Sequence, residues 1–179
     1  MAIQSGRSYR IVNVKAGTVL DLSGTDGVSV SGFTANGGNN QKWYLDNSSG
    51  HWTFRCGTGK YLGLDGEVQD GTPVIGVNQP VQWDIRPDEQ DGSVYRRVVV
   101  MLPRKEGVTD AGHTHYRIFV PNAPTAMNLD LSDHGNANPG TKVTLWTKWE
   151  GKHQCWKFEE GENDLRFKDN MFSFLESSV

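Results

Sequence analysis

The sequence predicts an all-β fold built from three similar segments. Glycine is abundant, with 21 among 179 residues, and short apolar runs are separated by Gly, Asn, Asp, Ser and Pro. This spacing is typical of short strands joined by tight turns, and no stretch has convincing helical periodicity. The order of the parts also recurs three times along the chain. The length fits one domain with its own core.

The strands are predicted where β-branched and aromatic residues gather. Residues 9–14, 52–55 and 116–120 are the clearest of these runs. Such side chains fit a pleated, half-buried surface, which favours strands over helices. Each run opens one of the three segments.

Two further motifs follow each opening strand in the same order. A Leu-x-Leu motif occupies residues 20–22, 62–64 and 129–131, and a Gln-Trp or Gln-x-Trp motif ends at Trp43, Trp83 and Trp156. We therefore predict a domain over residues 1–160, an insert between repeats two and three, and a C-terminal extension. The repeats are about 8–48, 50–88 and 114–160, the insert is 88–113, and the extension is 161–179.

The insert and the extension have less regular sequences. Residues 98–102 of the insert, Val-Val-Val-Met-Leu, predict an added edge strand or hairpin. The extension mixes charged residues with phenylalanines, and we expect it to pack locally or at a subunit contact.

Three such repeats need one another. Four short strands expose an apolar face that one repeat cannot bury, so three repeats are expected to close around a pseudo-threefold axis. The three motif tryptophans, Trp43, Trp83 and Trp156, are then core residues. Each indole nitrogen should find a carbonyl partner, because a buried N–H requires one.

Together these motifs resemble the ricin-B-like lectins, and especially their mushroom members. The resemblance covers residues 8–160 and implies a β-trefoil fold. It also implies a shallow sugar site in each active repeat. There, an Asp on the second strand accepts hydroxyl protons, an aromatic side chain stacks on the sugar ring, and an Asn before the Gln-x-Trp motif completes the contacts.

The first repeat matches this pattern. Asp21 matches the acceptor, Asn40 matches the amide and Gln41 matches the residue that braces the Asp, while Phe33 stands ten positions before Trp43 as the stacking candidate. A glycine-containing loop precedes Asn40 and leaves room for a ligand. The candidate site residues of this repeat are Asp21, Gly24, Phe33, Asn36, Gly38, Asn40 and Gln41. The alternative is that Asp21 and Asn40 form only turn hydrogen bonds and that Phe33 is a core residue.

The second repeat lacks the polar groups of the pattern. Gly63 stands at the acceptor position and Val81 at the amide position, whereas Asp65 lies two residues late on a turn. Without those groups nothing compensates sugar hydroxyls for the water they lose. We expect no sugar site here.

The third repeat is intermediate. It keeps Asp130 and Gln154 and offers Trp146, again ten positions before its motif tryptophan, but His153 replaces the Asn. A neutral imidazole donates and accepts from opposite ring edges, so it cannot copy an amide. This repeat is a possible second sugar site, and the bulk of Trp149 in its loop would reshape or block the pocket.

Composition excludes several other functions. The net charge of −3 offers no basic surface for nucleic acid. No apolar stretch is long enough to span a membrane, so we expect no membrane insertion. Cys56 and Cys155 stand in different segments outside any CxxC motif, which excludes a cysteine-based metal site. The two could form a disulfide, but we expect free thiols. His113 and His115 lack a third ligand, and we expect neither a cofactor nor a bound metal. The first residues form no apolar leader, which favours a cytoplasmic location or release without classical secretion.

We therefore expect a lectin without enzymatic activity. The resemblance implies terminal β-galactose or N-acetylgalactosamine ligands, such as lactose or N-acetyllactosamine, carried on glycoproteins or glycolipids, and a role in fungal defence. One shallow site binds weakly, so we also expect a homodimer that provides avidity. The alternative is a β-trefoil protease inhibitor acting through surface loops, because fold alone does not decide function.

Overall fold

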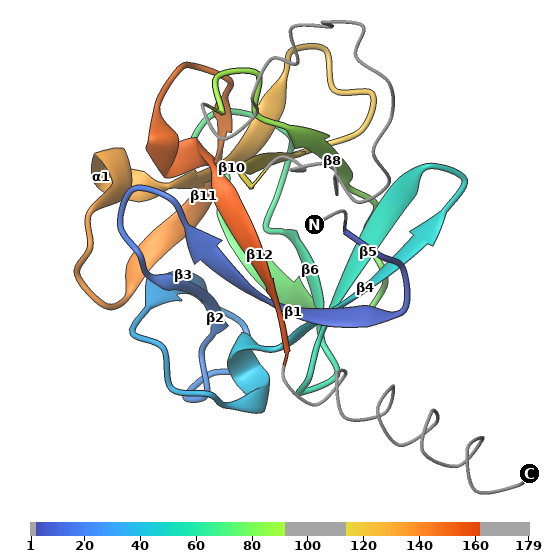
Figure 1. Ribbon diagram of the computed structural model, residues 1–179, viewed down its shortest axis with the longest axis vertical. Helices are drawn as coiled ribbons and strands as arrows, with labels where there is room; N and C mark the ends of the chain where they lie inside the picture. The colour runs from blue at the N-terminus through green and yellow to red at the C-terminus, as the bar shows by residue number, and fades with distance from the viewer. Residues whose placement is uncertain (1–2, 92–113, 162–179) are drawn as a thin grey trace, which may run out of the picture.

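A computed structural model describes residues 3–91 and 114–161 of the chain (Figure 1). These residues form twelve strands and little helix, which confirms the all-β prediction. The strands are Arg7–Asn13 (β1), Val19–Leu22 (β2), Val30–Phe33 (β3), Trp43–Ser48 (β4), His51–Cys56 (β5), Tyr61–Leu64 (β6), Val74–Val77 (β7), Asp84–Pro87 (β8), Tyr116–Phe119 (β9), Met127–Leu131 (β10), Thr141–Thr147 (β11) and Trp156–Glu160 (β12). The short helical segments are Asn39–Gln41 (η1), Ser132–Gly135 (α1) and Lys152–Gln154 (η2). Most of the predicted insert, with its run 98–102, and nearly all of the C-terminal extension lie outside the described residues.

Six of the described strands close into a barrel. Antiparallel pairing joins β1 to β4, β4 to β5, β8 to β9, β9 to β12 and β12 back to β1. The remaining seam joins β5 to β8, where the backbones of Trp52 and Trp83 exchange two hydrogen bonds of 2.8 Å each. Closure leaves these strands without an open edge.

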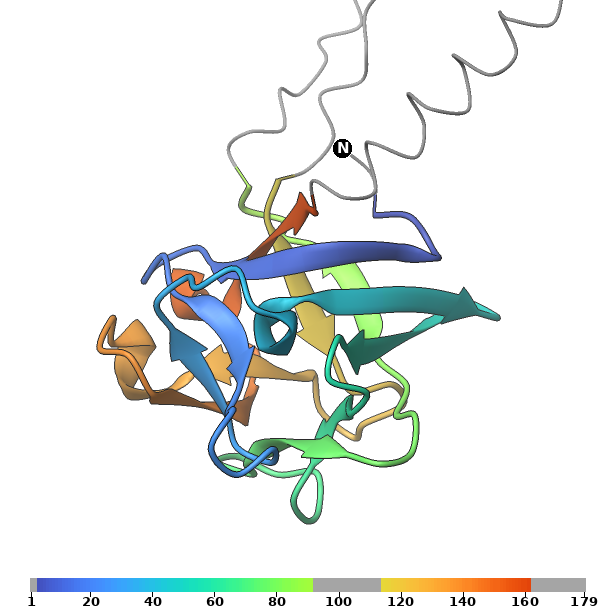
Figure 2. The ribbon, with the colours of Figure 1, turned by 90° about the horizontal axis from the view of Figure 1, so that it is seen from below.

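The other six strands form three hairpins that cap one end of the barrel. The hairpins are β2–β3, β6–β7 and β10–β11. They also touch one another in a ring, since Gly32 of β3 pairs with Thr141, Ser29 bridges Ile75, and Pro73 bridges Thr144. In Figure 2 the blue and cyan barrel strands β1 and β4 lie above the green β6–β7 hairpin. Each repeat thus supplies two barrel strands and one two-stranded hairpin, in the same order, as a β-trefoil requires.

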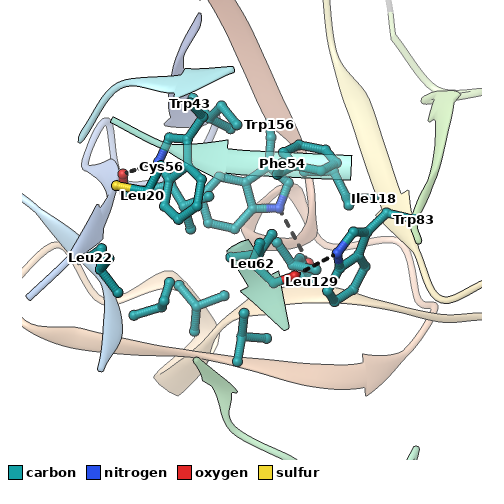
Figure 3. Packing of buried hydrophobic residues seen from close by; sticks show 14 of the residues in the cluster. Leu20, Leu22, Trp43, Phe54, Cys56, Leu62, Trp83, Ile118, Leu129 and Trp156 are labelled. Atoms are coloured by element: carbon teal, nitrogen blue, oxygen red, sulfur yellow. Dashed lines mark hydrogen bonds between the residues drawn. The ribbon is translucent and has the colours of Figure 1, made fainter. Parts of the chain in front are cut away.

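The core shows the threefold repetition most directly. The three motif tryptophans have 0% of their surface exposed and point into a shared cluster (Figure 3). Each indole nitrogen donates to a leucine carbonyl of its own repeat: Trp43 to Leu20 over 2.9 Å, Trp83 to Leu62 over 3.1 Å, and Trp156 to Leu129 over 3.3 Å. The predictions of core tryptophans with carbonyl partners are confirmed.

The two cysteines lie in different repeats, Cys56 on β5 of the second and Cys155 just before β12 of the third. Both are buried and free, with the Cys56 thiol donating to the Asn39 carbonyl and the Cys155 thiol to that of Gly151. Burial raises the pKa of Cys155 to about 11, which keeps this thiol protonated and unreactive. Across residues 3–91 and 114–161, no trio of His, Cys, Asp or Glu is arranged to hold a metal ion. The same ranges contain no helix long and apolar enough to cross a bilayer.

The two sides of the predicted insert meet at the barrel. The Asp91 carboxylate accepts hydrogen bonds from the backbone N–H groups of Thr114 and His115, over 2.7 and 2.8 Å. Nearby, the buried Arg117 of β9 donates through Nε to Asp88 over 2.8 Å. Residues 88–91 and 114–117 are therefore fixed side by side although the sequence separates them.

Candidate functional site

In the first repeat, hairpin pairing places Asp21 and Phe33 on one outward face. Asp21 lies across from Ser31, and Val19 lies across from Phe33. Side chains two apart on a strand share a face, so Phe33 is the diagonal neighbour of Asp21. Phe33 is 40% exposed, which contradicts the alternative that it is a core residue.

The Asp21 carboxylate is held from one side only. Asn40 Nδ2 and Gln41 Nε2 both donate to Asp21 Oδ2 over 2.8 Å. Within the described residues no protein group donates to Oδ1 of the same carboxylate, which leaves an acceptor for a ligand. Burial raises the pKa of Asp21, and the two amide hydrogen bonds oppose that rise.

Gln41 is the brace that the sequence predicts. Its Nε2 also donates to the Thr34 carbonyl over 2.8 Å, and its Oε1 accepts from the backbone N–H of Asn36 over 2.8 Å. All of its polar atoms are satisfied and it is buried, so its amide orientation is fixed. It therefore holds Asp21 in position and is not itself offered to a ligand.

The amide of Asn40 also serves the protein more than a ligand. Its Nδ2 donates to both Asp21 and the Leu22 carbonyl, the latter over 3.2 Å, which leaves its side-chain oxygen as an acceptor. A Cβ at Gly38 would come within 2.5 Å of that oxygen, so a larger residue there would displace the Asn40 amide. Asn36 binds Gly38 N through its own side chain, whereas Gly24 has open space around it. The structure brings Asp21, Asn40 and Gln41 together, with Asn36 and Gly38 supporting the loop.

The second repeat has lost more than its polar groups. Val77 lies across from Tyr61, as Phe33 lies across from Val19, so it occupies the place of the stacking aromatic. A Cβ at Gly63 would come within 2.5 Å of Val77 Cγ2. Even an Asp at Gly63 would therefore meet a filled face. Phe33 stands ten positions before Trp43, and the position ten residues before Trp83 is Pro73. The spacing from the motif tryptophan therefore does not identify Val77.

The third repeat rebuilds the brace of the first. Gln154 Nε2 donates to Asp130 Oδ2 over 3.0 Å and to the Thr147 carbonyl over 3.2 Å. Its Oε1 accepts from the backbone N–H of Trp149 over 3.0 Å, as Gln41 accepts from Asn36. The acceptor carboxylate is thus positioned by the same device in both repeats.

His153 makes the third site different. Its Nε2 lies 3.3 Å from Asp130 Oδ2 and also accepts from the Trp149 indole N–H over 3.1 Å. Burial lowers the pKa of His153 and raises that of Asp130 to about 6, so at a pH of about 7 the imidazole is neutral while most of the carboxyl group is still ionised. The Trp149 ring, 48% exposed, is therefore held at the site by the residue that replaces the usual Asn.

A pocket of about 260 Å³ opens over Asp130. Its lining residues are Asp130, Ser132, Asp133, His134, Thr144, Trp146, Trp149 and His153. Sequence reasoning named Asp130, Trp146 and His153 as site residues, and Trp149 as a bulk that reshapes it, but missed Asp133 and His134. Those two enter because α1 is a left-handed turn, with φ of 54° at Asp133 and 51° at His134.

A larger hollow of about 320 Å³ lies elsewhere, between β1, β12 and the loop before η1. Gln41, Gly38, Arg10 and Glu159 are among the residues that line it, and Asp21 is not. It therefore does not open onto the Asp21 carboxylate.

Comparison with known proteins agrees with this geometry. The family described as ricin-type beta-trefoil lectin domain-like matches residues 2–77. No curated protein sequence matches the chain. Among solved structures, the ricin B-like lectin of Macrolepiota procera, determined in complex with lactose, is 40% identical, with a TM-score of 0.74. The match covers 90% of this chain and 100% of that one.

More distant structures share the fold. The Rhizoctonia solani agglutinin is 24% identical with a TM-score of 0.69, and the match covers 90% of this chain and 99% of that one. An exo-β-1,3-galactanase of Clostridium thermocellum is 21% identical with a TM-score of 0.65, but the match covers 89% of this chain and only 31% of the enzyme. With its trefoil, its repeated braced carboxylate and full-length similarity to the Macrolepiota protein, this chain belongs to the ricin B-like lectins.

Proposed function

We propose that the protein is a lectin for terminal β-galactosides and N-acetylgalactosamine and that its first repeat is the main binding site. The observation that carries this is the Asp21 carboxylate, which has one oxygen fixed by two amides and the other open to the ligand face. A preorganised acceptor of this kind binds hydroxyl groups without the cost of ordering it first. The lactose complex of the Macrolepiota relative supports the ligand class.

Phe33 supplies the apolar half of the site. A galactose ring has one face of C–H groups, and an exposed phenyl ring next to an acceptor can cover that face. Phe33 is the exposed diagonal neighbour of Asp21. Asn40 Oδ1 and the backbone beside Gly24 complete the polar contacts that we propose.

The third repeat provides a second, weaker site in this proposal. Asp130 and the half-exposed Trp146 repeat the acceptor and the aromatic face, and the pocket between them is open. A ligand must share this pocket with Trp149, whose indole is bonded to His153. Binding to both sites, or homodimerisation, would provide the avidity that a defence lectin needs on a glycoprotein or glycolipid surface.

We propose no catalytic activity for the chain. Asp21 and Asp130, the two acceptor carboxylates, lie on separate hairpins, each held by its own glutamine. Glycoside hydrolysis uses two carboxyl groups that flank one glycosidic bond. The glycoside-cleaving relative is about three times longer than the part that this chain matches.

The test is calorimetric titration of lactose into the wild-type protein and into Asp21→Asn. The substitution keeps the shape of the side chain but removes the charged acceptor, so we expect at least about a tenfold loss of affinity at the first site. Asp65→Asn, on an exposed turn of the second repeat, is the matched control and should bind as the wild type does.

Thermal unfolding of each variant shows whether the fold persists. Absence of lactose binding by the folded wild-type protein contradicts the proposal and favours inhibition of proteases through surface loops. Equal affinity of the wild type and Asp21→Asn moves the main site out of the first repeat.

A further inference from the structure

We propose that the third-repeat pocket selects sugars that carry a free, protonated amino group, such as galactosamine. The inference rests on the proposed sugar-binding function and specifies the ligand of its second site. It comes from the residues that this pocket has and the first repeat lacks. Two carboxylates, two indoles and two imidazoles line it.

The two carboxylates have no cationic partner. Gln154, a neutral amide, donates to Asp130, and the Asn136 amide donates to Asp133 Oδ2 over 2.9 Å. Within residues 3–91 and 114–161 no lysine or arginine forms an ion pair with either carboxylate. The ionisable side chain bonded closest to Asp130 is His153, whose Nε2 lies 3.3 Å from Asp130 Oδ2. An ammonium group on the ligand is the complement that this pocket lacks.

The indoles favour the same ligand. Trp146 is 44% exposed and Trp149 is 48% exposed, and both line the pocket. The ring of His134 packs against Trp149 with centroids 5.7 Å apart. Faces of electron-rich rings attract cations, most strongly where water is partly excluded. A protonated sugar amine between the carboxylates and the indoles is therefore attracted by both kinds of group.

A left-handed turn of the backbone places Asp133 at the pocket. Asp133, His134 and Gly135 are three consecutive left-handed residues, with φ of 54°, 51° and 76°. Non-glycine residues adopt this conformation at an energetic cost, and such residues gather at ligand sites. Here the turn carries Asp133 and His134 to the rim of the pocket.

Two positively charged side chains near the pocket are bonded to protein groups. Lys15 Nζ donates to the His134 carbonyl over 2.5 Å, and Arg117 is bonded to Asp88 and to the Gln154 oxygen behind the site. His134, the other ionisable side chain of the turn, packs its ring against Trp149.

The first repeat is the internal control. After the shared Leu-Asp-Leu-Ser motif it has Gly24 where the third repeat has Asp133. Asn36 and Asn40 stand in place of Trp149 and His153. That site has the single acceptor carboxylate of Asp21 and a single aromatic candidate in Phe33. The acid of its loop, Asp26, is bonded to Val28 N and to Ser29. The first site should therefore not distinguish an amine from a hydroxyl to the same extent.

The experiment compares galactosamine, galactose and N-acetylgalactosamine at a pH of about 7, using the full chain with Asp21→Asn to weaken the first site. Tryptophan fluorescence reports binding beside Trp146 and Trp149. At low salt we expect galactosamine to bind at least about fivefold more tightly than galactose, because a charge-assisted contact replaces a neutral one. N-Acetylgalactosamine, which has no charge, should not share this gain, and added salt should reduce it.

Asp133→Asn, introduced beside Asp21→Asn, should bring the galactosamine-to-galactose ratio close to one. Asparagine tolerates a positive φ, so the turn should persist, and Asp133→Gly offers a second variant with the residue of the first repeat. Equal affinities for galactosamine and galactose in the Asp21→Asn protein overturn the inference but leave the third-repeat sugar site intact. Binding of neither sugar overturns both, whereas lactose binding by the wild type still supports the first-repeat site.

Discussion

The guanidinium of Arg117 donates to the side-chain oxygen of Gln154 over 3.1 Å, behind the third-repeat pocket. The same arginine binds the Trp149 carbonyl over 3.0 Å and forms a buried ion pair with Asp88. Among the described residues no arginine donates to Gln41 of the first repeat, whose side-chain oxygen accepts from Asn36 N. One cation thus ties the base of the predicted insert, the loop of Trp149 and the brace of Asp130 together.

Arg117→Met should destabilise the protein by about 3 kcal/mol, because it leaves the Asp88 carboxylate buried without its partner. Urea denaturation measures the change. The double variant Asp88→Asn with Arg117→Met should recover much of the loss, since no uncompensated charge remains. Lactose binding at the first site should survive in both variants. A single variant as stable as the wild type would show that water reaches Asp88.

Gln41→Glu tests the brace of the first repeat. The substitution replaces the amide that donates to Asp21 with a second carboxylate in a buried position. At neutral pH we expect a loss of roughly 2–4 kcal/mol in unfolding free energy and no measurable lactose binding at this site. Both effects should diminish in acid as one carboxyl group takes up a proton, which a pH series of thermal unfolding would show. Gln82→Glu, at an exposed glutamine of the second repeat, is the matched control.

Gly63→Ala tests how tightly Val77 fills the second repeat. The new methyl group would overlap Val77 Cγ2, so we expect destabilisation of about 1–3 kcal/mol. Val77→Ala alone creates a smaller loss, and the double variant should be more stable than the sum of the two changes indicates. A double-mutant cycle by chemical denaturation measures this coupling. Strict additivity would mean that the two side chains do not compete for the same space.

The pH dependence of stability reports on Asp130. Burial raises the pKa of Asp130 to about 6 in the folded protein, from an ordinary value of 3.8. Between these values the folded state retains a proton that the unfolded chain releases, so this group favours folding in acid and its contribution falls as the pH rises to about 6. Asp130→Asn should lack this fall and be more stable than the wild type at pH 7, by about 1–3 kcal/mol.

Chemical denaturation at several pH values between 4 and 7 checks the prediction, with Asp65→Asn as the control. A constant stability difference between wild type and Asp130→Asn across that range would contradict it. Sugar binding at the third site should weaken below about pH 6, because Asp130 then loses its charge.

Much of the fold follows from a few repeated residues. The position of Trp43, Trp83 and Trp156 after each Leu-x-Leu motif predicts the trefoil and the indole–carbonyl bonds of the core. The motif Asn-Gln-x-Trp likewise places Asn40 and Gln41 beside Asp21. These are local patterns that recur in register, so the sequence displays them directly.

Other features depend on information that spacing does not carry. Val77 takes the stacking position through strand register, although it stands at a different distance from its tryptophan than Phe33 does. Asp133 reaches the third pocket only through a left-handed backbone, for which Asp and His give a weak signal and glycine a strong one. Arg117 is joined to Gln154 by tertiary packing between strands far apart in sequence.

The pairing of β1 with β12 also bears on how quickly the chain folds. Tyr9 lies across from Glu160 and Asn13 across from Trp156, so the barrel closes only when the two most distant described strands meet. Contacts of such long sequence separation require a large loss of chain entropy before they stabilise anything. We therefore expect folding in milliseconds to seconds, as for other domains dominated by non-local strand pairs, and a transition state in which this seam is still open.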